Sequence, residues 1–251
     1  TITEAEEISD FKINSAYINI PGKYVTIVQN SIVKEAKDKY SGISLKDVTL
    51  AMNQIRDIEI PADKILIDIV PDKFILDDGK VTDDPIGKFS SSFTLLAQII
   101  LAEKEYVKKV TNIFRKAGLD IDGIVPNTLA ERNLVLDINE LNDNVMLLDI
   151  GAGNTDIGIF NGSTYIYTNT LPLGGDNVTN DISYVLNISL EEAEKLKRQY
   201  GLALKSFIDN DNNIVLNTYM GGDSKSKTIK SSELIEIIEA RVEEIFALVN
   251  K

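Results

Sequence analysis

The residues best suited to chemistry lie together in the segment 145–176. Four apolar residues lead into Asp149, a turn containing Gly151 and Gly153 follows, and a second apolar run returns. This pattern predicts a strand, a glycine turn and a strand. Glycines lack the Cβ atoms that keep a phosphate away from the backbone, so successive N–H groups can face one concavity. The turn would therefore suit the phosphates of a nucleotide.

Polar side chains and a second glycine pair complete this predicted phosphate site. Asn154 and Thr155 offer side-chain donors, and Asp149 lies where a carboxylate could hold Mg²⁺ through a bound water. Gly174 and Gly175 open a helical pattern, so they form a second place where backbone N–H groups could bind an anion. The alternative is a plain β-hairpin turn capped by Asp149, because glycine and asparagine dominate such turns. No GxxxxGK[ST] or GxGxxG pattern occurs, so neither a P-loop nor a Rossmann site is predicted.

The residues around this loop resemble the FtsA family of bacterial cell-division proteins, within the actin/Hsp70/sugar-kinase superfamily. The resemblance is carried by DIGAGNTDIGIF at 149–160 and by LPLGGDNVTNDISYVLNISLEEAEKLKRQYG at 171–201. It implies an α/β, actin-like (ribonuclease H-like) ATPase fold, incomplete in this chain, with ATP and Mg²⁺ bound between two large domains. It also implies recruitment of the tubulin-like polymer protein FtsZ and attachment to the membrane.

The resemblance also assigns residues to the adenosine half of the site. In the superfamily a Glu and a Lys on the helix after the diglycine reach the ribose and adenine, and the matching residues here are Glu194 and Lys197. These two lie three apart and share one helix face, so a solvated ion pair is the alternative. Relatives often place Gln or Glu where this chain has Asn127, and the shorter side chain implies at most a slow ATPase. No catalytic residue is assigned.

The domain organisation follows from the same resemblance, which a DPIG sequence at 84–87 supports. We expect 1–30 to be part of the first actin-like domain, 31–117 an inserted small α/β subdomain of the FtsA 1C (SHS2-like) type, 118–144 a return to the first domain, 145–188 the start of the second actin-like domain with its phosphate loop, and 189–251 a 2B-like subdomain.

Hydrophobic periodicity predicts the individual elements. They are a hairpin or strand pair over 17–28, a helix from Ser44 with a capping box, strands at 65–70, 73–76 and 93–101, a helix over 103–117, a strand over 119–126, a helix over 129–136, a capped helix from Ser189 to Gly201, a strand at 214–218 between polar loops at 210–213 and 221–227, and an amphipathic helix over 233–249. The helix over 103–117 is expected to face inward with Tyr106, Val110, Ile113, Phe114 and Ala117.

Composition limits the class of function. Lys and Arg number 26 against 39 Asp and Glu, for a net charge of −13. Nucleic-acid binding needs clustered cations, so we predict no nucleic-acid partner, and the same charge disfavours contact with anionic lipid. Cysteine and histidine are absent, which excludes disulfides, thiolate or imidazole metal sites and a His-based triad. No apolar run reaches the length of a membrane-spanning helix and no signal peptide opens the chain, so we predict a cytoplasmic protein.

The resemblance implies three contacts for a protein at the inner face of the cell membrane at the division site. They are the C-terminal peptide of FtsZ on 189–249, self-association through 31–117, and membrane attachment through a C-terminal helix that this chain lacks. A first phosphate loop and an adenosine-contacting segment are also missing, so we expect a fragment that binds ATP weakly. A PilM-like type IV pilus assembly protein and an ATP-dependent kinase stay open as alternatives.

Overall fold

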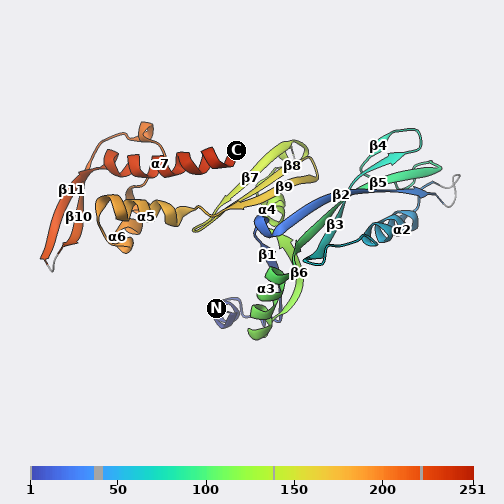
Figure 1. The fold of residues 1–251 in the computed structure, drawn as a ribbon, viewed down its shortest axis with the longest axis horizontal. Coiled ribbons are helices and arrows are strands. Elements are labelled where there is room, and N and C mark those ends of the chain that lie inside the picture. The colour runs from blue at the N-terminus through green and yellow to red at the C-terminus, as the bar shows by residue number, and fades with distance from the viewer. Residues whose placement is uncertain (1, 37–41, 138, 221–222) are drawn as a thin grey trace. The chain divides into compact units, whose positions relative to one another are not determined.

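The computed structural model describes residues 2–36, 42–137, 139–220 and 223–251 (Figure 1). The chain forms two compact units. Unit 1 comprises residues 1–147 and 157–169, and unit 2 comprises 148–156 and 170–251. Helices and sheets occur in both units, which confirms the expected α/β class.

Unit 1 contains an antiparallel sheet in the order β2-β5-β3-β4 (Figure 1). Its strands are β2 (Val25–Glu35), β3 (Lys64–Leu76), β4 (Val81–Thr82) and β5 (Ser92–Glu103), and helix α2 (Leu45–Arg56) packs on one face through Ala51 and Ile55. The helix begins at the predicted capping box, because Ser44 Oγ accepts from the Asp47 N–H and the Asp47 carboxylate accepts from the Ser44 N–H.

Strand β5 is buried on both of its faces. Leu95 and Ile99 belong to the apolar cluster beneath α2, whereas Ile100 packs with Phe160 and Tyr165 on the other face. A strand between two cores needs apolar residues in succession instead of alternation. This explains why the predicted strand at 93–101 is rich in apolar residues at successive positions, interrupted only by Thr94 and Gln98.

The remaining elements of unit 1 surround a second, two-stranded sheet in which β1 (Ser15–Ile20) pairs in parallel with β6 (Asp120–Pro126). Helix α3 (Lys104–Lys116) buries Val107 in the cluster that also holds Ile18 and Ile20, and it ends at Gly118, whose φ of +81° is left-handed. The other elements are α1 (Ile2–Ser9), η1 (Gly22–Tyr24), α4 (Asn127–Val135) and η2 (Glu140–Asn142).

Three local predictions for unit 1 are wrong. Strands β1 and β2 do not form a hairpin, because the turn η1 sends them into different sheets, where β1 pairs with β6 and β2 with β5. The expected strands at 65–70 and 73–76 are one strand, β3, whose register shifts beside Pro71, a residue that cannot donate to the ladder. Ile113 and Ala117, both expected to face inward, are exposed, Ile113 to 65%.

A three-stranded sheet contributes residues to both units. Its strands β7 (Asn144–Ile150), β8 (Thr155–Asn161) and β9 (Thr164–Leu171) follow one another in space as in sequence. The predicted glycine turn joins β7 to β8, and a turn at Gly162, with a φ of +55°, joins β8 to β9. The strand, glycine turn and strand expected from the sequence are therefore present.

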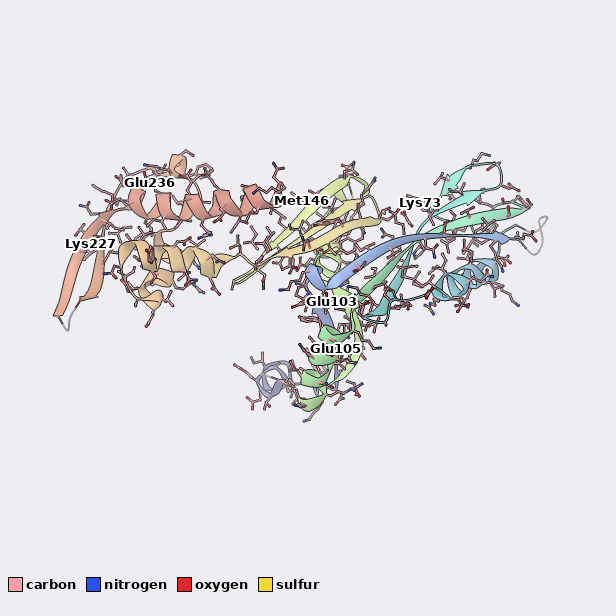
Figure 2. The ribbon with its side chains drawn as sticks, viewed as in Figure 1. Lys73, Glu103, Glu105, Met146, Lys227 and Glu236 are labelled. Atoms are coloured by element: carbon pink, nitrogen blue, oxygen red, sulfur yellow. The ribbon has the colours of Figure 1, made fainter. Side chains whose placement is uncertain are left out.

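Unit 2 packs three helices against an antiparallel two-stranded sheet (Figure 1). The helices are α5 (Gly175–Leu186), α6 (Leu190–Tyr200) and α7 (Ser231–Val249), with η3 (Lys205–Phe207) before the strands β10 (Asn213–Met220) and β11 (Asp223–Lys230). Ile182, Leu216 and Leu234 are fully buried between these elements. Figure 2 shows charged side chains projecting from them, such as Lys227 on β11 and Glu236 on α7.

The polar loop predicted at 221–227 is wrong from Asp223 onward, where β11 begins, and residues 221 and 222 lie outside the described residues. The sequence of β11, DSKSKTIK, is mostly polar and shows no alternation of apolar and polar residues, so it did not indicate a strand. The five-part division of the chain stays a prediction. Strand β2 continues across the expected boundary at residue 31.

Candidate functional site

The loop 151–154 presents unsatisfied backbone donors. The Gly151 N–H donates to the Asn154 carbonyl at 2.9 Å and closes the turn. Among the described residues, the N–H groups of Ala152, Gly153 and Asn154 have no acceptor, and all four loop residues are exposed. A Cβ on Gly153 would meet no atom within 4 Å. Three successive free N–H groups beside open space form the kind of concavity that binds anions.

The first residues of α5 fix the orientation of this loop. The Gly175 N–H donates to the Gly151 carbonyl at 2.9 Å, and the Asp176 N–H donates to the Ala152 carbonyl at 2.7 Å. In a planar trans peptide the C=O and the following N–H point in opposite directions. Because both carbonyls point toward α5, the next two N–H groups point away from it. A Cβ on Gly174 would lie 2.5 Å from the Gly151 carbonyl oxygen, so glycine is required there.

The structure brings the other predicted phosphate-site residues to the same loop, with different degrees of access. Asn154 is exposed, and Asp149 is half-buried at the end of β7, with no side-chain partner among the described residues. Thr155 is fully buried, and its Oγ1 donates to the Leu173 carbonyl at 2.8 Å. The Thr155 hydroxyl therefore ties β8 to the segment before α5.

Glu194 and Lys197 lie on α6 and contact the first turns of α5. The Lys197 ammonium pairs with Glu194 Oε2 at 2.6 Å and donates to the Gly175 carbonyl at 3.0 Å. Arg198 Nε donates to the other Glu194 oxygen at 2.7 Å. Hydrogen bonds from Lys197, and then from Thr179 and Arg198, lower the pKa of Glu194 to about 2. The ion pair expected as the alternative is present. Its Lys197 also binds the carbonyl of Gly175, the residue whose N–H donates to the loop.

Two residues at this site were missed by the sequence analysis. Asn177 Oδ1 accepts from the Gly174 N–H at 2.9 Å and so caps the residue that precedes α5. Thr179 Oγ1 donates to Glu194 Oε2 at 2.5 Å and accepts from the Lys197 ammonium at 2.8 Å. Asn177 lies three residues after Gly174, the residue that precedes α5. A polar side chain at this spacing is a sequence signal for a cap at the start of a helix. Thr179 Oγ1 also lies 3.2 Å from the Gly175 carbonyl oxygen within α5, but nothing in the sequence indicates its contacts with Glu194 and Lys197, which come from another helix.

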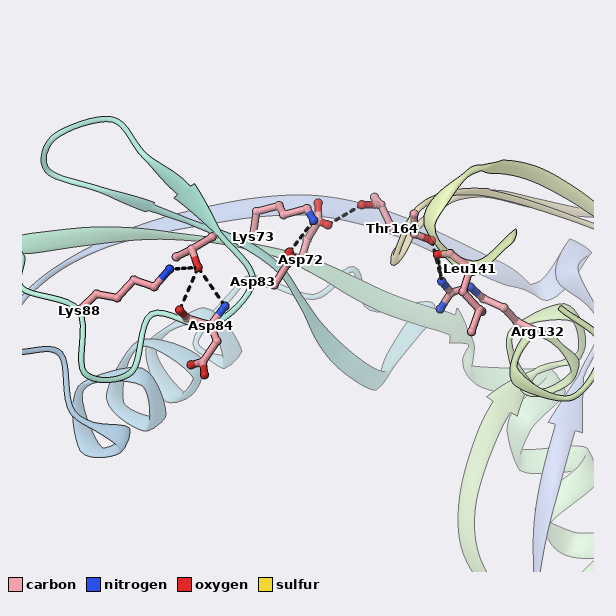
Figure 3. Close-up of polar contacts among 10 residues, drawn as sticks. Asp72, Lys73, Asp83, Asp84, Lys88, Arg132, Leu141 and Thr164 are labelled. Carbon is pink, nitrogen blue, oxygen red and sulfur yellow. Dashed lines mark hydrogen bonds and ion pairs between the residues drawn. The ribbon is translucent and has the colours of Figure 1, made fainter. Parts of the chain in front are cut away.

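Unit 1 holds a second polar region, a cavity of about 590 Å³ (Figure 3). It is lined by Pro71, Asp72, Lys73, Asp83, Arg132, Asn133, Leu141, Asn161, Gly162, Ser163 and Thr164. Lys73 pairs with Asp83 at 2.5 Å, and the Thr164 hydroxyl donates to Asp72. Arg132 donates to the Leu141 and Gly162 carbonyls at 3.0 and 2.7 Å, and burial lowers its pKa. None of the sequence-predicted site residues lines this cavity.

Two sequence models of one family match the chain. The model described as the SHS2 domain inserted in FtsA matches residues 22–101, and the model described as cell division protein FtsA matches residues 146–248. The second match includes the glycine loop and helices α5, α6 and α7. The chain belongs to the FtsA family.

Whole-chain relatives agree with this family. The cell division protein FtsA of Bacillus subtilis is 30% identical over 248 residues, which cover 99% of this chain and 56% of that protein. The chain spans less than two thirds of the curated FtsA proteins that it matches, between 56% and 59% of those from B. subtilis and Escherichia coli.

Solved actin-like structures are more distant. MreB5 of Spiroplasma citri bound to ADP is 20% identical, with a TM-score of 0.48 over 59% of this chain and 47% of that one. A PilM-PilN type IV pilus biogenesis complex is 21% identical, with a TM-score of 0.45 over 79% of this chain and 56% of that one. Both scores lie below 0.5, so the family membership rests on the sequence matches.

The family resemblance expected from the loop residues is thus confirmed, and the chain has the expected mixed α/β fold. Among the helices that the structure describes, none is both long and apolar enough to cross a membrane.

Proposed function

We propose that the loop 151–154 binds the phosphates of ATP. The observation that carries the proposal is the row of N–H groups at Ala152, Gly153 and Asn154 that have no acceptor among the described residues. The hydrogen bonds from Gly175 and Asp176 turn the first two of them away from α5. The helix α5 contributes indirectly, because its first N–H groups orient the loop carbonyls. Membership of the FtsA family supports ATP as the nucleotide.

Mg²⁺ fits the same site through Asp149. Magnesium is usually held by one or two carboxylates together with phosphate oxygens and waters. The half-buried Asp149 carboxylate lies two residues before the loop and has no competing side-chain partner among the described residues. Asp149 would hold the ion through a water, and the ion would neutralise charge on the phosphates. Thr155 supports the loop through its contact with Leu173.

Glu194 and Lys197 would meet the ribose and adenine, as the family implies. Both side chains are partly exposed, at 32% and 21%, so ligand atoms can reach them. The proposed role is nucleotide-dependent binding and assembly, with at most slow hydrolysis of ATP.

The test is a titration of the ¹⁵N-labelled chain with Mg-ATP, followed through the backbone amide resonances of 151–154. We expect these resonances to shift with a dissociation constant of about 1 mM or weaker, which NMR detects. Gly153→Val should abolish the shifts, because the new side chain would fill the open space in front of the loop N–H groups.

The matched control is Ser163→Val, which places the same side chain in an exposed turn at the other end of β8. It should bind Mg-ATP like the parent chain. Unchanged binding by Gly153→Val, or no response of the loop amides to 10 mM Mg-ATP in the parent chain (a concentration about tenfold above that expected constant), would rule out the phosphate assignment.

We also propose that residues 189–249 contribute to the docking site for the C-terminal peptide of FtsZ. A groove of about 290 Å³ between α5 and α7 is lined by Asp181, Val185, Ile237, Ala240, Arg241 and Glu244. Val185 is 57% exposed there, and Arg241 holds Asp181 through two hydrogen bonds of 2.6 and 2.9 Å. An apolar strip beside a fixed ion pair suits a short peptide that carries both apolar and charged side chains.

Fluorescence anisotropy with a labelled FtsZ C-terminal peptide tests this docking site. Ala240→Glu places a carboxylate in the groove and should weaken binding at least tenfold, about 1.4 kcal/mol. Ala203→Glu adds the same charge to an exposed loop of unit 2 and should bind normally. Equal affinities for the two variants would place the peptide elsewhere.

We further propose that the protein joins FtsZ polymers to the inner face of the membrane at the division site, and that it associates with itself through 31–117. Strand β2 is an edge strand of the four-stranded sheet, and its Val33 is 68% exposed. An edge strand with exposed apolar residues is a template for pairing with another chain. Sedimentation of Val33→Lys should show fewer oligomers than the parent chain, and an unchanged distribution would exclude this edge.

A further inference from the structure

Thr179 lies at the centre of the contacts between α6 and the first turns of α5. The residue is buried, with 7% of its surface exposed. Its Oγ1 accepts from the Lys197 ammonium at 2.8 Å and donates to Glu194 Oε2 at 2.5 Å. Lys197 and Glu194 also pair directly at 2.6 Å. The three side chains therefore form a closed ring of hydrogen bonds.

This ring is connected to the phosphate-binding loop through one residue, Gly175. The Lys197 ammonium donates to the Gly175 carbonyl at 3.0 Å, and the Gly175 N–H donates to the Gly151 carbonyl at 2.9 Å. An ammonium has three protons, and Lys197 has three acceptors here, in Glu194, Thr179 and Gly175. Any change in the ring therefore changes the hydrogen bond that the Gly175 carbonyl accepts from Lys197 on α6.

We propose that Thr179 is a positioning residue that couples the Glu194–Lys197 pair to the outward orientation of the loop N–H groups. Without the hydroxyl, Lys197 and Glu194 lose the partner they share, and the ammonium can leave the Gly175 carbonyl for water. The first turn of α5 is then held less firmly, and so are the Gly151 and Ala152 carbonyls that it binds. The loop N–H groups lose their fixed direction.

A ligand can act on the ring in the same way. Nucleoside hydroxyl and amino groups that bind Glu194 or Lys197 compete with Thr179 for the same atoms. Occupation of the nucleoside side and of the phosphate side would therefore be energetically coupled through α5. This last step rests on the proposed function, whereas the ring and its connection to the loop are contacts within the protein alone.

The experiment compares Thr179→Val, which keeps the shape and removes the hydroxyl, with Thr179→Ser, which keeps the hydroxyl. Three quantities are measured by NMR on the labelled chain: the pKa of Glu194 from its carboxyl ¹³C shift, the amide resonances of 151–154, and the response to Mg-ATP. We expect the valine variant to raise the pKa of Glu194 from about 2 toward its usual 4.5, to shift the loop amides, and to weaken Mg-ATP binding about tenfold. The serine variant should match the parent chain.

A purely structural role for Thr179 predicts a different result. It would lower the melting temperature of the valine variant and leave the Glu194 pKa and the loop amides unchanged, which would overturn the proposal. Lys197→Met provides a second route if the valine variant does not fold, because it removes the donor to Gly175 and should shift the same loop amides. Loop amides that ignore both variants would also overturn it. A parent chain that does not respond to Mg-ATP, with the ligand-free changes as expected, would contradict the nucleotide proposal and leave the coupling intact.

Discussion

Two polar networks, one chosen from each unit, join separate elements and differ in charge and access. In unit 1, Gln98 on β5 donates to the Tyr165 carbonyl at 2.7 Å and accepts from the Tyr165 N–H at 2.8 Å. The Tyr165 hydroxyl is 2.7 Å from Thr128 Oγ1 on α4. All three residues are at most 1% exposed and none is charged at neutral pH. In unit 2, the ring of Thr179, Glu194 and Lys197 is charged and partly exposed.

Charge and exposure decide which of the two networks can respond to a ligand. A side-chain amide that satisfies both backbone groups of one residue in a dry interior has no better partner to move to, so it fixes β9 against β5. Carboxylate and ammonium groups that still touch water can exchange partners at lower cost. We therefore assign the unit 1 network to stability and the unit 2 ring to binding, and four measurements test this division.

The largest effect is expected for Gln98→Leu. Leucine fills a similar volume but leaves the Tyr165 N–H and carbonyl without their partner in a buried place. Each unsatisfied group costs about 1–3 kcal/mol. We therefore expect the free energy of unfolding to fall by about 3 kcal/mol, measured by urea unfolding followed by circular dichroism. Gln54→Leu on the exposed face of α2 is the control and should stay within about 0.5 kcal/mol. A loss in Gln98→Leu no larger than in this control would show that the buried network is not stabilising.

Gly174→Ala should have the next largest effect and acts on the loop clamp of unit 2. The added Cβ would lie 2.5 Å from the Gly151 carbonyl oxygen and 2.6 Å from that of Ala152. Relieving this overlap must separate α5 from the loop, at about 2 kcal/mol. Gly153→Ala, where a Cβ meets nothing within 4 Å, is the matched control and should be nearly neutral. Equal stabilities of the two variants would mean that the clamp is not rigid.

Acidification should distinguish the charged ring from the neutral network. Glu194 has a pKa of about 2 in the folded chain against an ordinary 4.5, so its stabilising effect is full above pH 4.5 and is lost as the pH falls toward 2. Because the group is partly exposed, the loss is about 0.5–1 kcal/mol. Glu194→Gln should remove this part of the pH dependence, and the exposed Glu243→Gln should not. The side chains of Gln98 and Thr128 carry no titratable group.

Local sequence patterns predicted the parts of this fold that local interactions determine. The capping box at Ser44, the glycine turn after β7 and the diglycine start of α5 each depend on residues within a few positions of one another. The resemblance carried by 149–201 identified the family for the same reason, since one continuous segment holds its motif. Long-range pairing was the weak point. Nothing near Pro21 indicates that β1 pairs with a strand about a hundred residues later.

The candidate site shows the same limit. Glycine spacing identified the loop, but not that α5 uses its N–H groups to orient the loop carbonyls, because this contact joins residues about 24 positions apart. Thr155 was expected to face a phosphate and instead donates to Leu173, a partner that appears only once β8 and α5 are adjacent. Thr179 lies on α5 and both its ring partners lie on α6, so helix spacing within α5 could not indicate it.

The smallest effect is expected at the outer edge of the ring, for Arg198→Ala. Arg198 contacts Glu194 at 2.7 Å but its side chain is 78% exposed, so water and salt screen the pair. The carboxylate would keep its contacts with Lys197 and Thr179. We therefore expect the melting temperature to change by about 1 °C or less, and this change to vanish in 0.5 M NaCl, where the Debye length is about 4 Å. A large, salt-independent loss would mean that Glu194 depends on Arg198 more than on the buried Thr179. The ring would then be a surface ion-pair network, and Thr179→Val should have no greater effect than Arg198→Ala on the loop amides.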